Sequence, residues 1–349
     1  MNCYNLLSQA AKENQDRRPG SSSSAAIRQL LNSLASGLKL NPKTAALPVY
    51  RFKNSLWLVI VGGLLITFSG YRFPPVGLVG SFFLLLLLFK ELNRPLLAKF
   101  AAARAENIIV NLPAKNKEIQ KVFLLTSYDT ESFLETPGNH HPVPYSILIY
   151  AIAVLMVLFS LGYLITRLVY LNHLNLLLLS IIGGLNLCAF NRVTAVTLKN
   201  CAALLETGMI LSKVKPDITS VTLCFCGSGA LNSGVIALLP EFAKGPKELT
   251  YVINLTETAN PEVKQFQLVS SEGPLLSKKA NPLLVNAITE VAREKSLAIE
   301  TIETREFTAT CQINRAKINP VTLITPQNES SSVQEVRELL CGLIRKLDH

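Results

Sequence analysis

Four apolar runs without a single charged residue limit most strongly what this chain can fold into. They form two close pairs, residues 55–71 with 75–89 and residues 145–166 with 168–190. A membrane-spanning helix needs about 20 mainly apolar residues. A buried core helix would explain one short run more readily than four paired ones. We therefore predict two transmembrane hairpins, at 55–89 and 145–190.

The basic residues predict an orientation for these hairpins. The chain has 34 Lys and Arg against 24 Asp and Glu, but the two hairpin turns carry only Arg72 and Arg167. Because basic loops stay on the cytoplasmic side, we expect a multi-pass protein of the cell membrane with its polar segments in the cytoplasm. Anionic membrane lipid explains the basic surplus, so no nucleic-acid partner is expected. The seven cysteines form no even framework, which fits the reducing cytosol.

The polar segments have the pattern of an α/β domain. Apolar strand-like runs alternate with runs of helical spacing, which favours a mostly parallel sheet sandwiched by helices. The expected strands are 107–112, 121–126, 219–226, 250–255 and 320–325. The first two are expected to be neighbours across a polar turn. We predict that residues 1–54, 90–144 and 191–349 assemble into one domain that the hairpins at 55–89 and 145–190 interrupt.

The sequence lacks the local motifs of several kinds of functional site. The glycine-rich stretch "CGSGALNSGV" has neither the spacing nor the Lys of a phosphate loop, and Ser228 lacks the GxSxG frame of a nucleophile elbow. The adjacent His140 and His141 have no ligand partner at metal-binding spacing. The apolar runs contain no acidic or basic residue, which argues against an ion-coupled transporter. Ser127 and Asp129, just after a predicted strand, remain as candidates.

Read in order, the polar segments resemble the zinc-dependent aminopeptidase family that includes bacterial leucyl aminopeptidase and glutamate carboxypeptidase, and especially its bacterial membrane-embedded members. The stretch "NIIVNLPAKNKEIQKVFLLTSYDTES" is similar to the family's Asn-Val-Val-Ala…Val-Leu-Leu-Ser-Ala-His-Tyr-Asp-Ser segment. "AVTLKNCAALLETGMIL" is similar to Asp-Asn-Ala-Ser-Gly-Val-Ala-Ala-Leu-Leu-Glu, and "YVINLTETA" to Ile-Asn-Leu-Asp-x-x-Gly. "RRPGSSSSAA" and "SVTLCFCGSGALNSGVIALL" resemble two further family segments, the second of which ends its strand in a Glu-Glu pair.

The resemblance implies a two-zinc site, but its ligands are missing at the matching positions. Ser127 stands at the position of the first His ligand, and Asp129 is the one retained carboxylate. The bridging Asp falls on Val196, the Glu-Glu pair on Gly229 and Ala230, and the later Asp on Thr256. Residues 326–332, "PQNESSS", contain no His where a closing His is expected. These side chains cannot replace the zinc ligands, so the resemblance implies a vestigial pocket with no catalytic residue, no metal and no cofactor.

Three hypotheses follow. The leading one is a non-catalytic membrane protein, a pseudopeptidase that binds or scaffolds a protein or peptide partner. The second is an active membrane-bound hydrolase with Cys224, Cys226 or Ser228 as nucleophile, assisted by Asp129 or Glu257. A purely structural or transport role would leave the large polar domain unused.

Overall fold

The computed structural model describes residues 3–15, 17, 21–49, 52–93, 103–129, 145–189, 197–227, 233–257, 263–272, 278–304, 313, 317–326 and 331–348. The chain divides into two compact units. The first comprises Met1–Val49, Ala103–Glu131 and Thr194–His349, and the second comprises Tyr50–Ala102 and Ser132–Val193.

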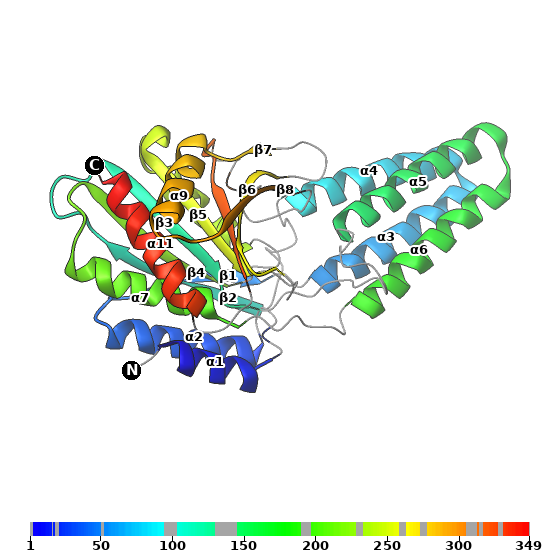
Figure 1. Ribbon diagram of the computed structural model, residues 1–349. Coiled ribbons are helices and arrows are strands. Elements are labelled where there is room, and N and C mark those ends of the chain that lie inside the picture. The colour runs from blue at the N-terminus through cyan, green and yellow to red at the C-terminus, as the bar shows by residue number, and fades with distance from the viewer. Residues whose placement is uncertain are drawn as a thin grey trace. The chain divides into compact units, whose positions relative to one another are not determined.

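The first unit is an α/β domain (Figure 1). Its helices are α1 (Cys3–Glu13), α2 (Ser22–Gly37), α7 (Lys199–Lys213), α8 (Ser233–Phe242), α9 (Pro282–Glu294) and α11 (Ser331–Leu347). Its strands are β1 (Lys43–Val49), β2 (Ala103–Leu112), β3 (Gln120–Ser127), β4 (Thr219–Cys226), β5 (Thr250–Glu257), β6 (Phe266–Glu272), β7 (Lys278–Lys279), β8 (Ile299–Thr304) and β9 (Val321–Thr325). A short 3₁₀ turn, η3 (Lys247–Leu249), leads into β5.

The strands form one mixed sheet, in the order β1-β2-β4-β3-β5-β9-β6-β7, with β8 paired to β6. The central strands β4, β3, β5 and β9 run parallel, as predicted. Antiparallel pairs join β1 to β2, β2 to β4, β9 to β6 and β6 to β7, whereas β6 and β8 run parallel. The prediction of a mostly parallel sheet is therefore correct for the centre and for the β6–β8 pair.

The prediction that β2 and β3 are neighbours is wrong, because β4 lies between them. The turn that joins β2 to β3 explains this insertion. The backbone N–H groups of Lys115, Asn116 and Ile119 donate to the carbonyl oxygens of Pro216, Asp217 and Ile218, just before β4 begins. The turn therefore binds the incoming end of β4 instead of closing a hairpin.

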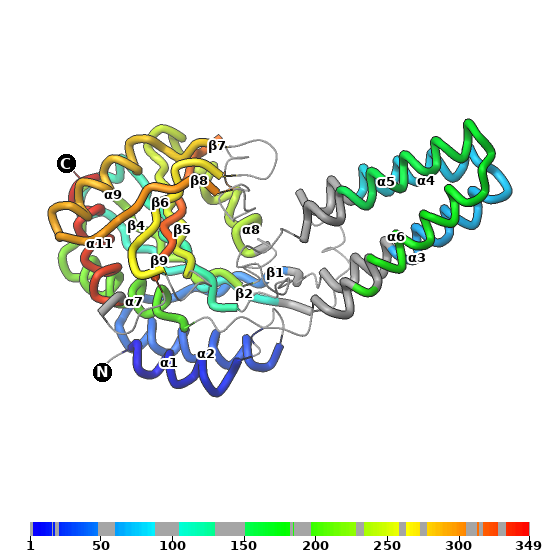
Figure 2. The backbone as a smooth tube through the Cα atoms, turned by 45° about the vertical axis from the view of Figure 1, so that its right-hand side comes forward, coloured from blue at the N-terminus to red at the C-terminus, as the bar shows by residue number. Residues whose placement is uncertain are grey.

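Alternating side chains of the central strands supply two cores, one on each face of the sheet. On β3, Val122 and Leu124 pack with residues of α1, α2, α7, α9 and α11, whereas Phe123 and Leu125 pack with α8. Figure 2 shows α8 on the opposite side of the sheet from α7 and α11. Because both faces are covered, the central strands are apolar at almost every position, which is why they could be recognised in the sequence.

Helix starts follow local capping rules. Ser21 caps α2, with its side chain accepting a hydrogen bond from the Ser24 N–H. Asn281 caps α9 in the same way, and Pro282 occupies the first turn. The serine-rich stretch is thus a loop that runs into a helix cap.

The second unit consists of four helices, α3 (Phe52–Arg72), α4 (Pro74–Asn93), α5 (Tyr145–Thr166) and α6 (Val169–Ala189). Both views show them running alongside one another (Figures 1 and 2). Their buried apolar side chains form a separate core that includes Ile60, Ile152 and Leu179. Their outward faces carry exposed large apolar side chains, among them Leu65 and Phe83. The four apolar runs are therefore helical, as expected.

Polar contacts also join these helices. The Ser81 and Ser160 hydroxyls lie 3.0 Å apart, and Asn175 Nδ2 donates to Ser160 Oγ at 3.1 Å. Asn172 Nδ2 donates to the carbonyl oxygen of Thr67 at 3.1 Å. Buried hydrogen bonds thus join α4 to α5, α5 to α6 and α6 to α3.

The described residues include no helix that is long and apolar enough to cross a membrane. This finding contradicts the prediction of two transmembrane hairpins. It likewise contradicts the predicted multi-pass protein of the cell membrane, in both its non-catalytic and its hydrolytic form.

Gly234 offers a test of the close packing at the end of β4. A Cβ at this position would lie 2.8 Å from Asn107 Oδ1 and closer still to the carbonyl oxygen of Gly227, whereas a Cβ at Gly37 would meet nothing within 4 Å. We expect Gly234→Ala to lower the free energy of unfolding by about 2 kcal/mol, because backbone must move. Gly37→Ala, in a helix, should be neutral or stabilising by about 0.5 kcal/mol. Urea unfolding of both variants measures the difference, and equal stabilities would contradict the packing.

Candidate functional site

The carboxyl ends of the parallel strands meet at one edge of the sheet. In the strand register, Ser127 of β3 pairs with Cys226 of β4, and Glu257 of β5 pairs with Thr325 of β9. In open α/β sheets this edge is where ligands bind. The sequence candidates Ser127, Asp129 and Thr256 all belong to it, so it is the candidate site.

Asp129 is tied to a helix far away in the sequence. Its side chain is buried, and its Oδ1 accepts a hydrogen bond from the Ser24 hydroxyl at 2.5 Å. The preceding Tyr128 is also buried and donates its hydroxyl to the carbonyl oxygen of Glu106 at 2.6 Å. Burial, together with the nearby charge of Asp129, raises the pKa of Tyr128. Hydrogen bonds between Asp129 and α2 and between Tyr128 and β2 therefore hold the segment after β3 in place.

Arg17 places a positive charge next to this edge. Its side chain is only 1% exposed, and its guanidinium donates to the carbonyl oxygens of Ala11, Asn14 and Tyr128. Burial lowers the pKa of Arg17, while negative charge on neighbouring groups, including Glu257, opposes that shift. Because arginine stays charged in proteins, this buried cation compensates acidic side chains at the edge.

Glu257 caps the start of α7. Its Oε2 accepts hydrogen bonds from the backbone N–H and the hydroxyl of Thr197, at 2.9 and 3.0 Å. Its Oε1 accepts from the backbone N–H of Lys199 at 3.1 Å. The cap residue itself, Leu198, has a left-handed φ of 62° and makes no side-chain capping bond. A carboxylate from β5 therefore supplies the acceptor that the helix start needs and compensates its positive dipole end.

Lys199 carries a second positive charge into the same region. Its side chain is 1% exposed, and within the described part of the chain its Nζ has no hydrogen-bond partner. Burial lowers the pKa of Lys199 to about 8, although the charges of Glu257 and Glu335 act in the opposite direction. Amines in ordinary lysines are protonated far above this pH. Lys199 is thus a strongly perturbed cation of the described site.

The remaining predicted positions are only partly described. Ser127 is half-buried and donates its hydroxyl to the carbonyl oxygen of Cys226 at 3.4 Å. Thr256 is half-buried, and its carbonyl oxygen accepts from the Thr325 hydroxyl at 3.2 Å. Val196, Gly229 and Ala230 lie outside the described residues, as do Ser228, His140 and His141.

The cysteines of β4 do not have the surroundings of nucleophiles. Cys224 and Cys226 point to the same face of the sheet and are buried against α8. Burial raises the pKa of both thiols, that of Cys226 to about 12 with a further contribution from Asp129. A thiol with so high a pKa is not a thiolate near neutral pH. The hypothesis of a cysteine nucleophile at these positions therefore has no support from the geometry.

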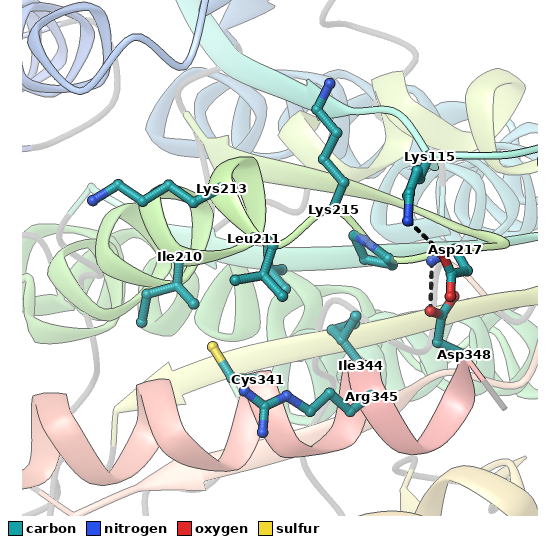
Figure 3. Close-up of a pocket in the computed structure, with 12 residues that line it drawn as sticks. Lys115, Ile210, Leu211, Lys213, Lys215, Asp217, Cys341, Ile344, Arg345 and Asp348 are labelled. Atoms are coloured by element: carbon teal, nitrogen blue, oxygen red, sulfur yellow. Dashed lines mark hydrogen bonds and ion pairs between the residues drawn. The ribbon is translucent and has the colours of Figure 1, made fainter.

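A groove of about 560 Å³ lies at the opposite edge of the sheet, where α7 and α11 end (Figure 3). Its basic lining residues are Lys115, Lys213, Lys215 and Arg345. Lys213 and Arg345 belong to the last turns of their helices, where cations compensate the negative dipole end. The side chains of Lys213 and Lys215 extend away from each other in Figure 3. The two lysines thus do not converge on one point.

The acidic residues of this groove are already bonded. Asp348 accepts hydrogen bonds from the backbone N–H groups of Asp217, Ile218 and Thr219. Burial alone would raise the pKa of Asp348, but these hydrogen bonds lower it below its ordinary value. Asp348 therefore fastens the end of α11 to the start of β4 and has a structural role.

Zinc ligands are absent from the part of the site that the structure describes. In that part of the chain, no group of three or more His, Cys, Asp or Glu side chains could hold a metal ion. The two carboxylates at the edge, Asp129 and Glu257, are bonded to the protein's own hydroxyl and N–H groups. The hydroxyl side chains of Ser127 and Thr256 are not among the usual protein ligands of zinc. The described residues do not fit a zinc pair.

Sequence reasoning did not identify three residues of this cluster, Arg17, Ser24 and Lys199. A signal was present for Lys199, because it begins a helix whose first seven residues are all buried. A lysine in such a surrounding is unusual.

Comparison with known proteins supports the fold. No protein-family model and no curated protein matches the chain. Solved structures that share its fold include a glutaminyl cyclase from an Acidobacteriales bacterium (12% identity, TM-score 0.55), which covers 99% of this chain and 94% of that one. A leucine aminopeptidase precursor from Bacteroides thetaiotaomicron (11%, TM-score 0.53) covers 99% and 96%. BSAP, a zinc aminopeptidase from Bacillus subtilis (10%, TM-score 0.55), covers 99% and 94%. The chain therefore has the fold of zinc-dependent exopeptidases and glutaminyl cyclases.

Removing the charge of Glu257 tests its capping role. Glu257→Gln keeps the shape of the side chain but turns charge-assisted hydrogen bonds into weaker ones and brings an amide donor towards N–H groups. We expect the free energy of unfolding to fall by about 2 kcal/mol. Glu248→Gln, at an exposed position of η3, should change it by less than about 0.5 kcal/mol. Denaturant unfolding compares the two, and equal effects would show that the cap contributes nothing.

The buried amine of Lys199 predicts how stability depends on pH. Its pKa is about 8 in the folded protein against 10.5 ordinarily, so between these values the unfolded chain binds more protons. Stability should therefore rise with pH from 8 to 10.5, by up to about 3 kcal/mol from this group. Lys199→Met removes the titrating amine, so the difference between the two proteins isolates its contribution. Parallel stability curves over this range would contradict the burial of a charged amine.

Proposed function

We propose that this chain has the fold of a zinc exopeptidase but holds no zinc pair and carries out no zinc-dependent hydrolysis or cyclisation. The chain matches solved peptidases and cyclases at low identity, so the fold by itself carries no activity over. The support comes from the chemistry of the candidate site.

One observation carries the proposal. The carboxylate of Glu257 is engaged by the start of α7, since it accepts two hydrogen bonds from Thr197 and one from Lys199. A metal ligand needs its carboxylate lone pairs directed at the ion. If Glu257 bound zinc, the N-terminus of α7 would lose its hydrogen-bond acceptor. The buried cation Lys199 would lose the negative charge that compensates it. Each of these changes is unfavourable in a buried site.

The charges at the carboxyl edge of the sheet also argue against a zinc pair. In a two-zinc enzyme, the metal ions neutralise the carboxylates around them and activate the attacking water. Here the buried Arg17 and Lys199 supply positive charge close to Glu257, and Arg17 also does so for Asp129. A divalent cation would have to enter a site that already contains these two cations. Coulomb repulsion at partly buried positions amounts to several kcal/mol.

The test is zinc binding together with activity. The full chain should show the same melting temperature in EDTA and in 100 μM zinc, because a ligand that does not bind the folded state cannot stabilise it. It should not hydrolyse aminoacyl p-nitroanilides or cyclise peptides with N-terminal glutamine above the buffer rate. A melting temperature that rises with stoichiometric zinc, with hydrolysis or cyclisation, would overturn the proposal. Glu257→Gln would then show whether the bound zinc uses this carboxylate.

A further inference from the structure

The groove at the ends of α7 and α11 is lined by both apolar and basic side chains (Figure 3). Leu211 and Ile344 line it and are otherwise buried in the domain, whereas the side chain of Val214 is 61% exposed. In the described part of the first unit, the only other exposed large apolar side chains are Ile119 and Leu283. A volume of about 560 Å³ is typical of sites that bind ligands. The groove thus offers accessible apolar surface on a domain that otherwise exposes little of it.

The positive charge of the groove exceeds what its own acidic groups balance. Asp217 is already in an ion pair, and Asp348 accepts hydrogen bonds from three backbone N–H groups. Lys213, Lys215 and Arg345 are exposed, and none of them forms an ion pair within the part of the chain that the structure describes. The ends of α7 and α11 together carry about one negative elementary charge. Three cations therefore leave an excess of positive charge along the groove.

The placement of these cations favours an extended ligand over a compact one. The side chains of Lys213 and Lys215 extend away from each other, and Arg345 belongs to the other helix (Figure 3). One small anion therefore does not meet all three cations. An extended chain with several carboxylates can pair with each of them in turn, and an apolar side chain between the carboxylates can contact Val214.

A single-stranded nucleic acid is also an extended anion, but its usual mode of binding differs. Proteins bind it by stacking bases on aromatic side chains in a basic groove. None of the 12 described lining residues is aromatic. The apolar lining is aliphatic, which suits the side chains of a peptide better than bases.

We propose that this groove binds an extended acidic segment of a partner protein. Carboxylates of the segment pair with Lys213, Lys215 and Arg345, and an apolar side chain between them packs against Val214. Clusters of basic side chains recognise acidic motifs in this way. The inference does not rest on the proposed function, because the groove lies at the edge of the sheet opposite to the carboxyl edge.

Peptide binding to the full chain tests the proposal. The probe is a fluorescein-labelled peptide in which pairs of glutamates alternate with single leucines. About nine residues suffice, because such a peptide spans up to about 30 Å when it is extended. The comparison ligands are the same peptide with serine in place of leucine, and a labelled oligothymidylate. Fluorescence anisotropy measures the dissociation constants at low and at high salt.

Two pairs of substitutions separate the groove from the overall charge of the chain. Lys213→Gln with Lys215→Gln removes two cations of the groove. Lys278→Gln with Lys279→Gln removes the same charge from exposed positions of β7, which β3, β5, β9 and β6 separate from β4. Glutamine is compatible with helices and with exposed positions, so both variants should keep the melting temperature of the native chain.

We expect saturable binding of the glutamate–leucine peptide to the native chain. The substitutions in the groove should weaken it by about fivefold to tenfold, because each exposed ion pair contributes a few-fold. The substitutions in β7 should change it by less than about twofold. The glutamate–serine peptide should bind at least about threefold more weakly, because it lacks the apolar contact. High salt should weaken binding of both peptides.

Three results would overturn the proposal. The first is no saturable binding of the glutamate–leucine peptide, and the second is an equal loss of affinity in the two variants. The third is tighter binding of the oligothymidylate than of the peptide, lost on substitution of Lys213 and Lys215, which would assign the groove to nucleic acid. All measurements are made in EDTA, so zinc binding, which would refute the proposed function, does not affect the result.

Discussion

The hydrogen bonds that Glu257 accepts from the start of α7 hold the sheet and a core helix of this domain together. They connect the carboxyl end of a central strand to the helix that fills much of one core. They also fix the backbone around Leu198, which has a left-handed conformation that costs a non-glycine residue about 1 kcal/mol or more. The carboxylate lies close to two buried cations, Arg17 and Lys199. Without it, both the helix start and these charges would lose their compensation.

This arrangement is the physical basis of the proposal that the fold holds no zinc pair. Carboxylates at the edge of the sheet need positive charge nearby, and either metal ions or protein cations can provide it. Here Arg17 and Lys199 do so, and the hydroxyl of Ser24 binds Asp129. In this proposal Asp129, the one retained carboxylate, and Glu257 stabilise the fold through these hydrogen bonds. A carboxylate that is kept at a family's site position is therefore no evidence for the family's chemistry.

The sequence predicted the central strands but not the charge cluster. β3, β4, β5 and β9 were recognisable because both of their faces are buried. The partners of Asp129 and Glu257 come from segments 105 and 60 residues away, so no local pattern reveals them. The insertion of β4 between β2 and β3 was missed for the same reason. The apolar runs predicted four helices correctly, whereas their interpretation as transmembrane hairpins is contradicted by the described residues.

The most direct measurement is anomalous X-ray diffraction at the zinc absorption edge, on crystals of the full chain grown with excess zinc. It shows whether the carboxyl ends of the central strands bind metal. If Glu257 and Asp129 remain bonded to the protein, no anomalous peak will lie within coordination distance of either carboxylate, and both will keep their hydrogen bonds to Thr197 and Ser24. A strong peak at about 2 Å from these oxygens would contradict this and would establish a zinc centre in the place of the hydrogen-bonded cluster.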